Sequence, residues 1–178
     1  MKPQTGFTLI ELMMVLIIAG ILASVGLPYM RDSLLNSRVR TAASDAHLSL
    51  LMARSEAIKR NRNVNINRTG ADWANGWSVC VAEPSPNEAD CDPAIETMSV
   101  RNALEDVTVA CNTNTDPAAD TCPAQVAFNR FGRPVVLIEY RFYVQDNTRV
   151  FARCAKISVS GVPRVVTDLD NDPDNGCG

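Results

Sequence analysis

The first thirty residues constrain the fold most, because they form one long apolar segment with a single acidic residue near its start. Residues 7–27 are almost all apolar, and Glu11 is the only charged side chain among them. A helix rises about 1.5 Å per residue, so about 20 such residues cross a bilayer core. A carboxylate in a membrane span costs roughly 2.5–3.5 kcal/mol on insertion scales. The sequence therefore predicts a membrane helix in which Glu11 has a function.

The whole chain has the size of one globular domain with an added segment. It has 178 residues, of which 21% are charged, and a formal net charge of −3. This balance excludes a generic nucleic-acid binder, so any such activity needs a local basic patch. No phosphate loop, no G-x-S-x-G motif and no free cysteine–histidine pair is present. His47 is the only histidine and has no second ligand nearby, so we expect no enzyme, no cofactor and no metal site.

The start of the apolar segment reads G-F-T-L-I-E at residues 6–11. This junction resembles the class III signal of type IV pilins and type II secretion pseudopilins, in which a prepilin peptidase cuts after the glycine and methylates the new N-terminus. The resemblance implies cleavage after Gly6, N-methylation of Phe7 and an assembly role for Glu11. The new amine of Phe7 is positive at neutral pH. It can pair with Glu11 of a neighbouring subunit and so favour one axial register between helices.

Helical spacing of apolar residues continues beyond the membrane segment. Proline removes a backbone donor and clashes with the preceding turn, so we expect a helix kink at Pro28. A stripe that recurs every three or four positions then predicts an amphipathic helix, and its members are Leu35, Val39, Ala42, Ala46, Leu50, Ala53 and Ala57. We expect one long helix over residues 7–60.

After residue 60 the hydrophobic period changes from that of a helix to that of strands. The strand candidates are NVNINR, GWSVCVAE, TMSVRN, VTVAC, AQVAFN, VVLIEYRFYV, RVFARCAKISVS and PRVVT. A turn-rich segment between the first two predicts a β-hairpin. The pattern as a whole predicts an α+β fold, in which a long N-terminal helix, half of it transmembrane, packs on an antiparallel β-sheet head.

The expected division of the chain follows from these segments. Residues 1–6 are a leader peptide, residues 7–30 a transmembrane or filament-core helix, and residues 31–178 a periplasmic head. Within the head, residues 31–60 are helical and residues 61–178 form the β-sheet region. The long polar connections at residues 83–94 and 112–123 are expected to be exposed loops.

The six cysteines suit a translocated domain in an oxidising space. Many connectivities are possible for six cysteines, and nearest-neighbour pairing is our hypothesis. It gives the disulfides Cys80–Cys91, Cys111–Cys122 and Cys154–Cys177. None of the cysteines forms a C-x-x-C motif, which argues against a zinc ribbon or a thioredoxin-like redox site.

Four later segments, ARSEAIKRNRNVNINR, GWSVC, FNRFGRP and SVSGVPRVV, resemble the GspH/FimT family, and GWSVC and the late glycine turn are closer to FimT/FimU minor pilins. The resemblance implies a low-copy subunit that helps to start pilus assembly near the tip. The alternative is a GspH-type minor pseudopilin of a type II secretion system. The implied partners are the prepilin peptidase, other major and minor pilins through the N-terminal helix, and the inner membrane. The implied locations are the inner membrane and then the pilus fibre outside the cell.

FimT-type members are linked to DNA uptake in natural transformation through a C-terminal glycine-arginine-any-arginine turn. Residues 161–164 match this turn at Arg164 but carry Val162 at the first arginine position. One lost phosphate contact reduces affinity, so DNA binding is expected to be weak and without sequence preference. The candidate residues are Arg164, Arg153, Lys156, Arg149 and Arg133, with Arg149 and Arg153 expected on one strand face. The alternative is that these are ordinary surface charges.

Two further charged clusters have structural interpretations. The first is favoured at a helix end by the helix dipole, and consists of Arg54, Lys59, Arg60, Arg62 and Arg68. The second spaces four aspartates by two, like the start of a calcium loop, at Asp168, Asp170, Asp172 and Asp174. It lacks the glycine and the glutamate that an EF-hand loop requires. We expect an acidic, solvated loop closed by Cys177.

Overall fold

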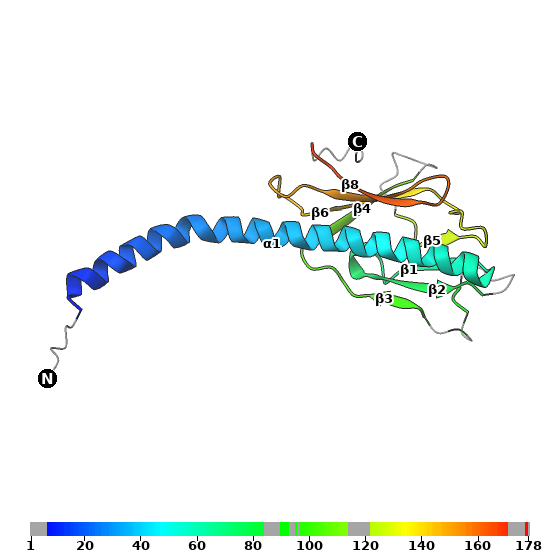
Figure 1. The fold of residues 1–178 in the computed structure, drawn as a ribbon, viewed down its shortest axis with the longest axis horizontal. Helices are drawn as coiled ribbons and strands as arrows, with labels where there is room; N and C mark the ends of the chain where they lie inside the picture. The colour runs from blue at the N-terminus through cyan, green and yellow to red at the C-terminus, as the bar shows by residue number, and fades with distance from the viewer. Residues whose placement is uncertain are drawn as a thin grey trace. The chain divides into compact units, whose positions relative to one another are not determined.

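The computed structural model describes residues 7–83, 90–92, 95, 97–113, 122–170 and 177. One long helix, α1 (Leu9–Arg60), precedes eight strands that form two four-stranded sheets (Figure 1). The chain divides into two compact units, Met1–Leu34 and Leu35–Gly178. The second unit therefore contains the later half of α1 together with both sheets.

The first unit consists of the early part of α1. This part is long and apolar enough to cross a membrane, and its most apolar window is entirely unburied. The helix continues without a break through position 28, so the proline does not end it. The predicted kink at Pro28 stays a prediction.

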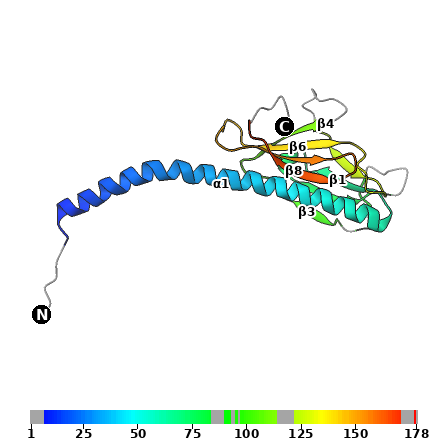
Figure 2. The same ribbon diagram turned by 45° about the horizontal axis from the view of Figure 1, so that its top comes forward.

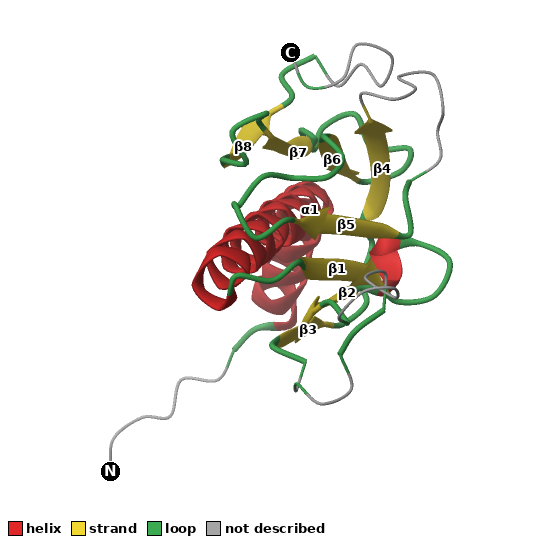
Figure 3. Ribbon diagram, turned by 90° about the vertical axis from the view of Figure 1, so that its right-hand side faces the viewer, coloured by secondary structure: helices red, strands yellow, loops and turns green. Residues whose placement is uncertain are grey.

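The later half of α1 packs through the stripe expected from the sequence. All seven stripe residues are buried, which confirms that prediction. Four of them are alanines, and Ala43 beside the stripe is buried too. Small side chains allow a helix backbone to approach a sheet closely. Viewed from the side in Figure 3, the two sheets lie on two different sides of α1, and in the turned view of Figure 2 β3 appears below α1 and the strands β6 and β8 above it.

The two sheets are antiparallel throughout the described pairs. The first sheet has the order β3 (Ser99–Arg101), β2 (Trp77–Val81), β1 (Val64–Arg68) and β5 (Gln125–Phe128). The second has the order β4 (Thr108–Thr113), β6 (Ile138–Tyr143), β7 (Arg153–Ile157) and β8 (Pro163–Thr167). Every strand candidate thus contains a strand, and β1 and β2 form the predicted hairpin around the short helix η1 (Trp73–Asn75).

Three disulfides connect the chain, and they are the three nearest-neighbour pairs. Cys80–Cys91 joins β2 to the segment before β3, and Cys111–Cys122 spans the connection from β4 to β5. Cys154–Cys177 holds the C-terminal segment against β7. Much of residues 83–94 and 112–123, which were expected to be exposed loops, lies outside the described residues.

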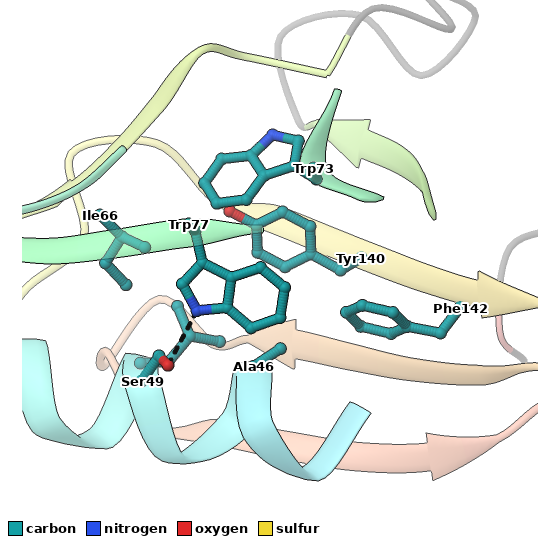
Figure 4. Close-up of a pocket in the computed structure, with 8 residues that line it drawn as sticks. Ala46, Ser49, Ile66, Trp73, Trp77, Tyr140 and Phe142 are labelled. Carbon is teal, nitrogen blue, oxygen red and sulfur yellow. Dashed lines mark hydrogen bonds between the residues drawn. The ribbon is translucent and has the colours of Figure 1, made fainter. Parts of the chain in front are cut away.

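An aromatic cluster fills the space between α1 and the two sheets (Figure 4). The rings of Trp73 and Tyr140 meet edge to face with centroids 4.8 Å apart. Trp77 lies between them and the helix, and its Nε1 donates a hydrogen bond of 2.9 Å to Ser49 Oγ. Trp73 Nε1 donates to the carbonyl oxygen of Pro123 at 2.8 Å. Both indole donors are therefore satisfied inside the core.

The hydroxyl of Tyr140 differs from these indoles. It is buried and has no hydrogen-bond partner within the described part of the chain. Burial raises the pKa of this phenol well above its ordinary value, because the charged form would lose its hydration. The Tyr140 hydroxyl is therefore desolvated in the core without a hydrogen bond that offsets this cost.

Replacing Tyr140 with Phe should stabilise the protein by about 1 kcal/mol at neutral pH, because it removes a buried hydroxyl without a partner. The gain should grow above about pH 10, where the unfolded phenol ionises while the buried one stays neutral, so the wild type alone loses stability as pH rises. Urea unfolding of the detergent-solubilised chain, followed by tryptophan fluorescence at neutral and alkaline pH, measures both effects.

The matched control is Tyr143→Phe at a half-buried position on the same strand. It should change stability less at alkaline pH. Lower stability of the Tyr140→Phe protein at neutral pH would show that the hydroxyl has a partner and would contradict this account.

Candidate functional site

Two parts of the molecule contain the candidate residues, and the first is the start of α1. Gly6 lies outside the described residues, so cleavage after it stays a prediction. Phe7 is largely exposed, and Glu11 lies in the first turn of α1. The backbone amide of Glu11 donates to Thr8 Oγ1 at 3.3 Å, and the Thr8 hydroxyl lies 3.5 Å from Glu11 Oε2.

Thr8 therefore caps the helix N-terminus by accepting from the Glu11 amide, which is the first half of a capping box. Thr8 precedes the first helical residue, and Glu11 occupies the third helical position, as in the pattern Ser/Thr-x-x-Glu. A carboxylate in the first turn also interacts favourably with the helix dipole. Glu11 thus has a role inside its own chain, which the sequence analysis did not consider. The spacing T-L-I-E was the signal that could have indicated it.

The second part is the end of the head at which α1 finishes, called here the Arg60 end. The 129–133 turn after β5 meets α1 there, and the 158–162 turn after β7 packs on the 129–133 turn. A Cβ on Gly132 would lie 2.6 Å from Ile58 Cδ1, and one on Gly161 would lie 2.1 Å from the Gly132 carbonyl oxygen. Both glycines also have positive φ, +71° and +78°. The backbone of the 158–162 turn therefore packs directly on the backbone of the 129–133 turn, which requires glycine at position 161.

The 158–162 turn closes through its own hydrogen bonds. The amide of Gly161 donates to the Ser158 carbonyl oxygen at 2.8 Å, and the amide of Val162 donates to Ser158 Oγ at 3.1 Å. Val162 is 38% exposed. A longer side chain at this position would reach solvent without displacing the turn.

Strand register separates the basic residues that the sequence analysis grouped together. Lys156 lies opposite Arg164, so these two share one face of the second sheet. Arg153 lies opposite Phe142 and Thr167, on the face that carries the buried aromatic residues. The grouping of Arg153 with Arg164 is therefore wrong in its geometry. The Arg153 guanidinium instead donates to Thr167 Oγ1 at 2.9 Å.

Arg149 does not share a strand face with Arg153 either. β7 begins at Arg153, and Arg149 lies in the preceding turn. Asn147 Oδ1 accepts hydrogen bonds from the amides of Arg149 and Val150, at 2.9 and 3.3 Å. Such an asparagine turn satisfies the backbone locally and so keeps the chain out of the sheet. The strand predicted from Arg149 onward therefore begins only at Arg153.

Lys156 is engaged in holding the C-terminal segment. Its Nζ lies 3.1 Å from Glu139 Oε2 and also donates to the carbonyl oxygen of Cys177. The amide of Cys177 donates to Glu139 Oε1 at 2.8 Å, and its sulfur is bonded to Cys154. The charge of Lys156 is therefore balanced by Glu139, and its side chain is not free for a ligand.

The position of Asp168 also differs from our prediction, which placed it in a solvated acidic loop. It is 1% exposed and forms an ion pair with Arg141, whose Nη2 and Nε lie 2.9 and 3.0 Å from Asp168 Oδ2. The alternating polar residues of IEYRFY, Glu139 and Arg141, could have indicated a covered polar face on β6. Asp172 and Asp174 lie outside the described residues.

Most cations of the predicted helix-end cluster have structural partners. Lys59 and Arg60 pair with Glu56, and the hydrogen bond from Arg60 lowers the pKa of that carboxyl. Arg62 pairs with Asp92 at 2.8 Å, and Arg68 donates to the Cys122 carbonyl oxygen. These contacts fit the structural interpretation of this cluster.

Three of the five candidate cations are exposed, and one of them, Arg149, lies apart from the others in the turn before β7. Arg133 and Arg164 are exposed, and neither side chain makes a hydrogen bond or ion pair with any residue that the structure describes. The Arg60 end therefore has uncompensated positive charge although the whole chain is acidic. Such a local patch is what anion binding by an acidic protein requires.

Comparison with known families agrees with this architecture. Residues 42–162 match the family model described as type II transport protein GspH, and residues 1–27 match the prokaryotic N-terminal methylation motif. The GspH match covers more than half of the chain, so the protein belongs to the GspH family. Its members are pilin and pseudopilin subunits with structural roles, not enzymes.

The curated relatives that match this chain are fimbrial proteins. A fimbrial protein of Pseudomonas aeruginosa is 39% identical over 72 residues, which is 40% of this chain and 46% of that protein. The chain thus spans about half the length of the curated relatives it matches.

Two solved structures show the same fold at low identity. The type IV minor pilin FimU of P. aeruginosa has 19% identity and a TM-score of 0.55, over 80% of this chain and 96% of FimU. The minor pseudopilin EpsH of the Vibrio cholerae type II secretion system has 12% identity and a TM-score of 0.57, over 78% of this chain and 99% of EpsH.

Replacing Gly161 with Ala should destabilise the protein by more than the left-handed backbone alone explains. Any L-residue at positive φ costs about 1 kcal/mol. At Gly161 the new methyl group would also displace the Gly132 carbonyl, which adds about 1–3 kcal/mol of overpacking. Urea unfolding measures the total.

Gly70→Ala is the matched control. Its φ of +73° is similar, but the nearest atom to the new methyl group is the flexible Asn75 Nδ2 at 3.3 Å. This variant should show the backbone cost alone. Equal losses for the two variants would mean that the contact between the two turns is not tight.

Proposed function

We propose that this protein is a minor type IV pilin that helps to initiate pilus assembly near the tip. Residues 1–6 are removed by the prepilin peptidase, Phe7 is methylated, and the early part of α1 anchors the chain in the inner membrane. The head is periplasmic and later lies on the fibre. The observation that carries the proposal is an acidic residue at the start of an unburied apolar helix, inside a matched N-terminal methylation motif.

The second candidate is a minor pseudopilin of a type II secretion system. The description of the matching family supports it, whereas the fimbrial relative supports the pilus. The fold supports both equally, because FimU and EpsH match with similar TM-scores of 0.55 and 0.57. Both functions use the same assembly chemistry at the start of α1.

In an assembled filament, the charge on Glu11 would be balanced by the N-terminal amine of a second subunit. An unpaired carboxylate in an apolar bundle is unfavourable, and so is an unpaired amine. When the Phe7 amine of one subunit meets Glu11 of the next, the two charges balance at one axial offset only. The pair therefore selects register, as a buried polar residue does in a coiled coil.

Glu11→Ala should leave membrane insertion intact and reduce incorporation into the filament, because the benefit of the charge arises between subunits. Glu11→Gln separates the two roles of this residue. Glutamine can still accept from the Thr8 hydroxyl through its side-chain oxygen but has no charge, so it should fail as alanine does. The measurement compares the subunit in the membrane fraction and in sheared filaments after cross-linking. Normal incorporation of the Gln variant would assign Glu11 to helix capping and contradict the pairing.

We also propose that the Arg60 end binds DNA weakly and without sequence preference, through Arg164 and Arg133. The support is their exposure at one end of an otherwise acidic chain. Lys156 and Arg153 are excluded from this revised patch, because the first is paired with Glu139 and the second lies on the other sheet face. The proposal concerns contacts with phosphates, which carry no sequence information.

Arg164→Gln should weaken binding to duplex DNA, and Val162→Arg should strengthen it by restoring a second cation in the turn. Each phosphate contact changes the salt slope by about 0.9 log units per tenfold salt. Arg153→Gln is the matched control and should leave binding unchanged. Titrations of the full chain over a salt series test this. If the two turn variants bind as the wild type does, the hairpin is no DNA site.

A further inference from the structure

The 129–133 turn at the Arg60 end exposes an aromatic ring. Phe131 is 70% exposed, whereas Phe128, three residues earlier, is fully buried. The guanidinium carbon of Arg130 lies 5.3 Å from the centroid of the Phe131 ring, over its face. A cation and an aromatic ring are thus already layered on this turn.

The turn is held rigidly by its own polar contacts. Asn129 Oδ1 accepts hydrogen bonds from the amides of Phe131 and Arg133, at 3.0 and 3.1 Å. The backbones of Asn129 and Arg133 are also hydrogen-bonded at 2.9 Å. Gly132 packs on Ile58 beneath it and on Gly161 beside it. The backbone that carries the ring is therefore already ordered, which lowers the entropy cost of binding.

The surroundings of the ring are positive. Residues 129–135 and 158–165 contain Arg130, Arg133 and Arg164 and no acidic residue. Arg54 lies beneath the turn, with its Cγ 3.3 Å from the Cβ position of Gly132. Its Nε is buried and has no hydrogen-bond partner among the described residues. A ligand for this surface must combine negative charge with a flat apolar face.

We propose that Phe131, with Arg130 behind it, is a stacking platform for a base of single-stranded DNA, and that Arg133 and Arg164 contact the adjacent phosphates. This inference rests on the proposed DNA contact and specifies the strand state that the site prefers. Aromatic side chains in a positive surface bind single strands because every unpaired base offers a π-face. In a duplex those faces are stacked on one another, so only the phosphates are available to this turn.

An acidic protein surface is the competing ligand for such a patch. A protein partner would surround an anchoring aromatic residue with apolar contacts. Here Arg130 lies over the ring and Arg133 is exposed on the same turn, although the two segments also expose Val135 and Val159. A layered arrangement of guanidinium, ring and base continues this geometry directly, so the observations favour a nucleic acid.

The test uses the full chain in detergent micelles with a fluorescent oligothymidine of about 20 nucleotides, a duplex of equal length and polyglutamate as probes. Phe131→Leu keeps the apolar character but removes the aromatic face. It should weaken oligothymidine binding about tenfold, which is the scale of one stacked base, and leave duplex binding unchanged. Phe131→Tyr is the matched control and should bind as the wild type does. Equal melting temperatures verify that both exposed substitutions leave the fold intact.

Several outcomes would overturn the inference. If Phe131→Leu binds oligothymidine as the wild type does, while Arg164→Gln weakens duplex binding, the DNA function stands and the stacking platform does not. If polyglutamate competes as well as oligothymidine and Phe131→Leu weakens both, the surface recognises acidic proteins. If neither DNA probe binds the wild type, the DNA function and the platform fail together.

Discussion

The close packing of α1 against both sheets is the contact on which the rest of the head depends. Alanines at four of seven stripe positions let the helix approach closely enough for one aromatic cluster to touch α1, β2 and β6 at once. A larger residue at these positions would separate the layers and expose the indole that donates to Ser49. Because α1 ends beside Gly132, the same packing also positions the turns of the Arg60 end.

Much of this fold follows from the sequence because its patterns are local. The buried stripe of α1 and all eight strands were predictable, since periods near 3.6 and 2 record which side of each element is covered. The disulfide pairing of the structure is the one that nearest-neighbour spacing suggests. The start of β7 was placed too early. The side chain of Asn147 accepts from the Arg149 amide and holds this segment in a turn, and the hydrophobic pattern does not show such a hydrogen bond.

The charged residues were harder to assign, since their roles depend on contacts between distant segments. Asp168 pairs with Arg141 and Lys156 with Glu139 across strands, and no short motif records either pair. Arg153 and Arg164 looked equivalent in the sequence, but the register of β7 and β8 puts them on opposite faces. The turn that carries Phe131 likewise packs on Gly161, which is far away along the chain.

The capping contact between Thr8 and Glu11 has a consequence for the life of the subunit before it assembles. In the single chain the Glu11 carboxylate already lies 3.5 Å from the Thr8 hydroxyl at the start of the same helix. If Glu11 later meets a neighbouring amine, it exchanges an internal contact for an external one. Under the proposed function, entry into the fibre would then begin with a local rearrangement at the helix start.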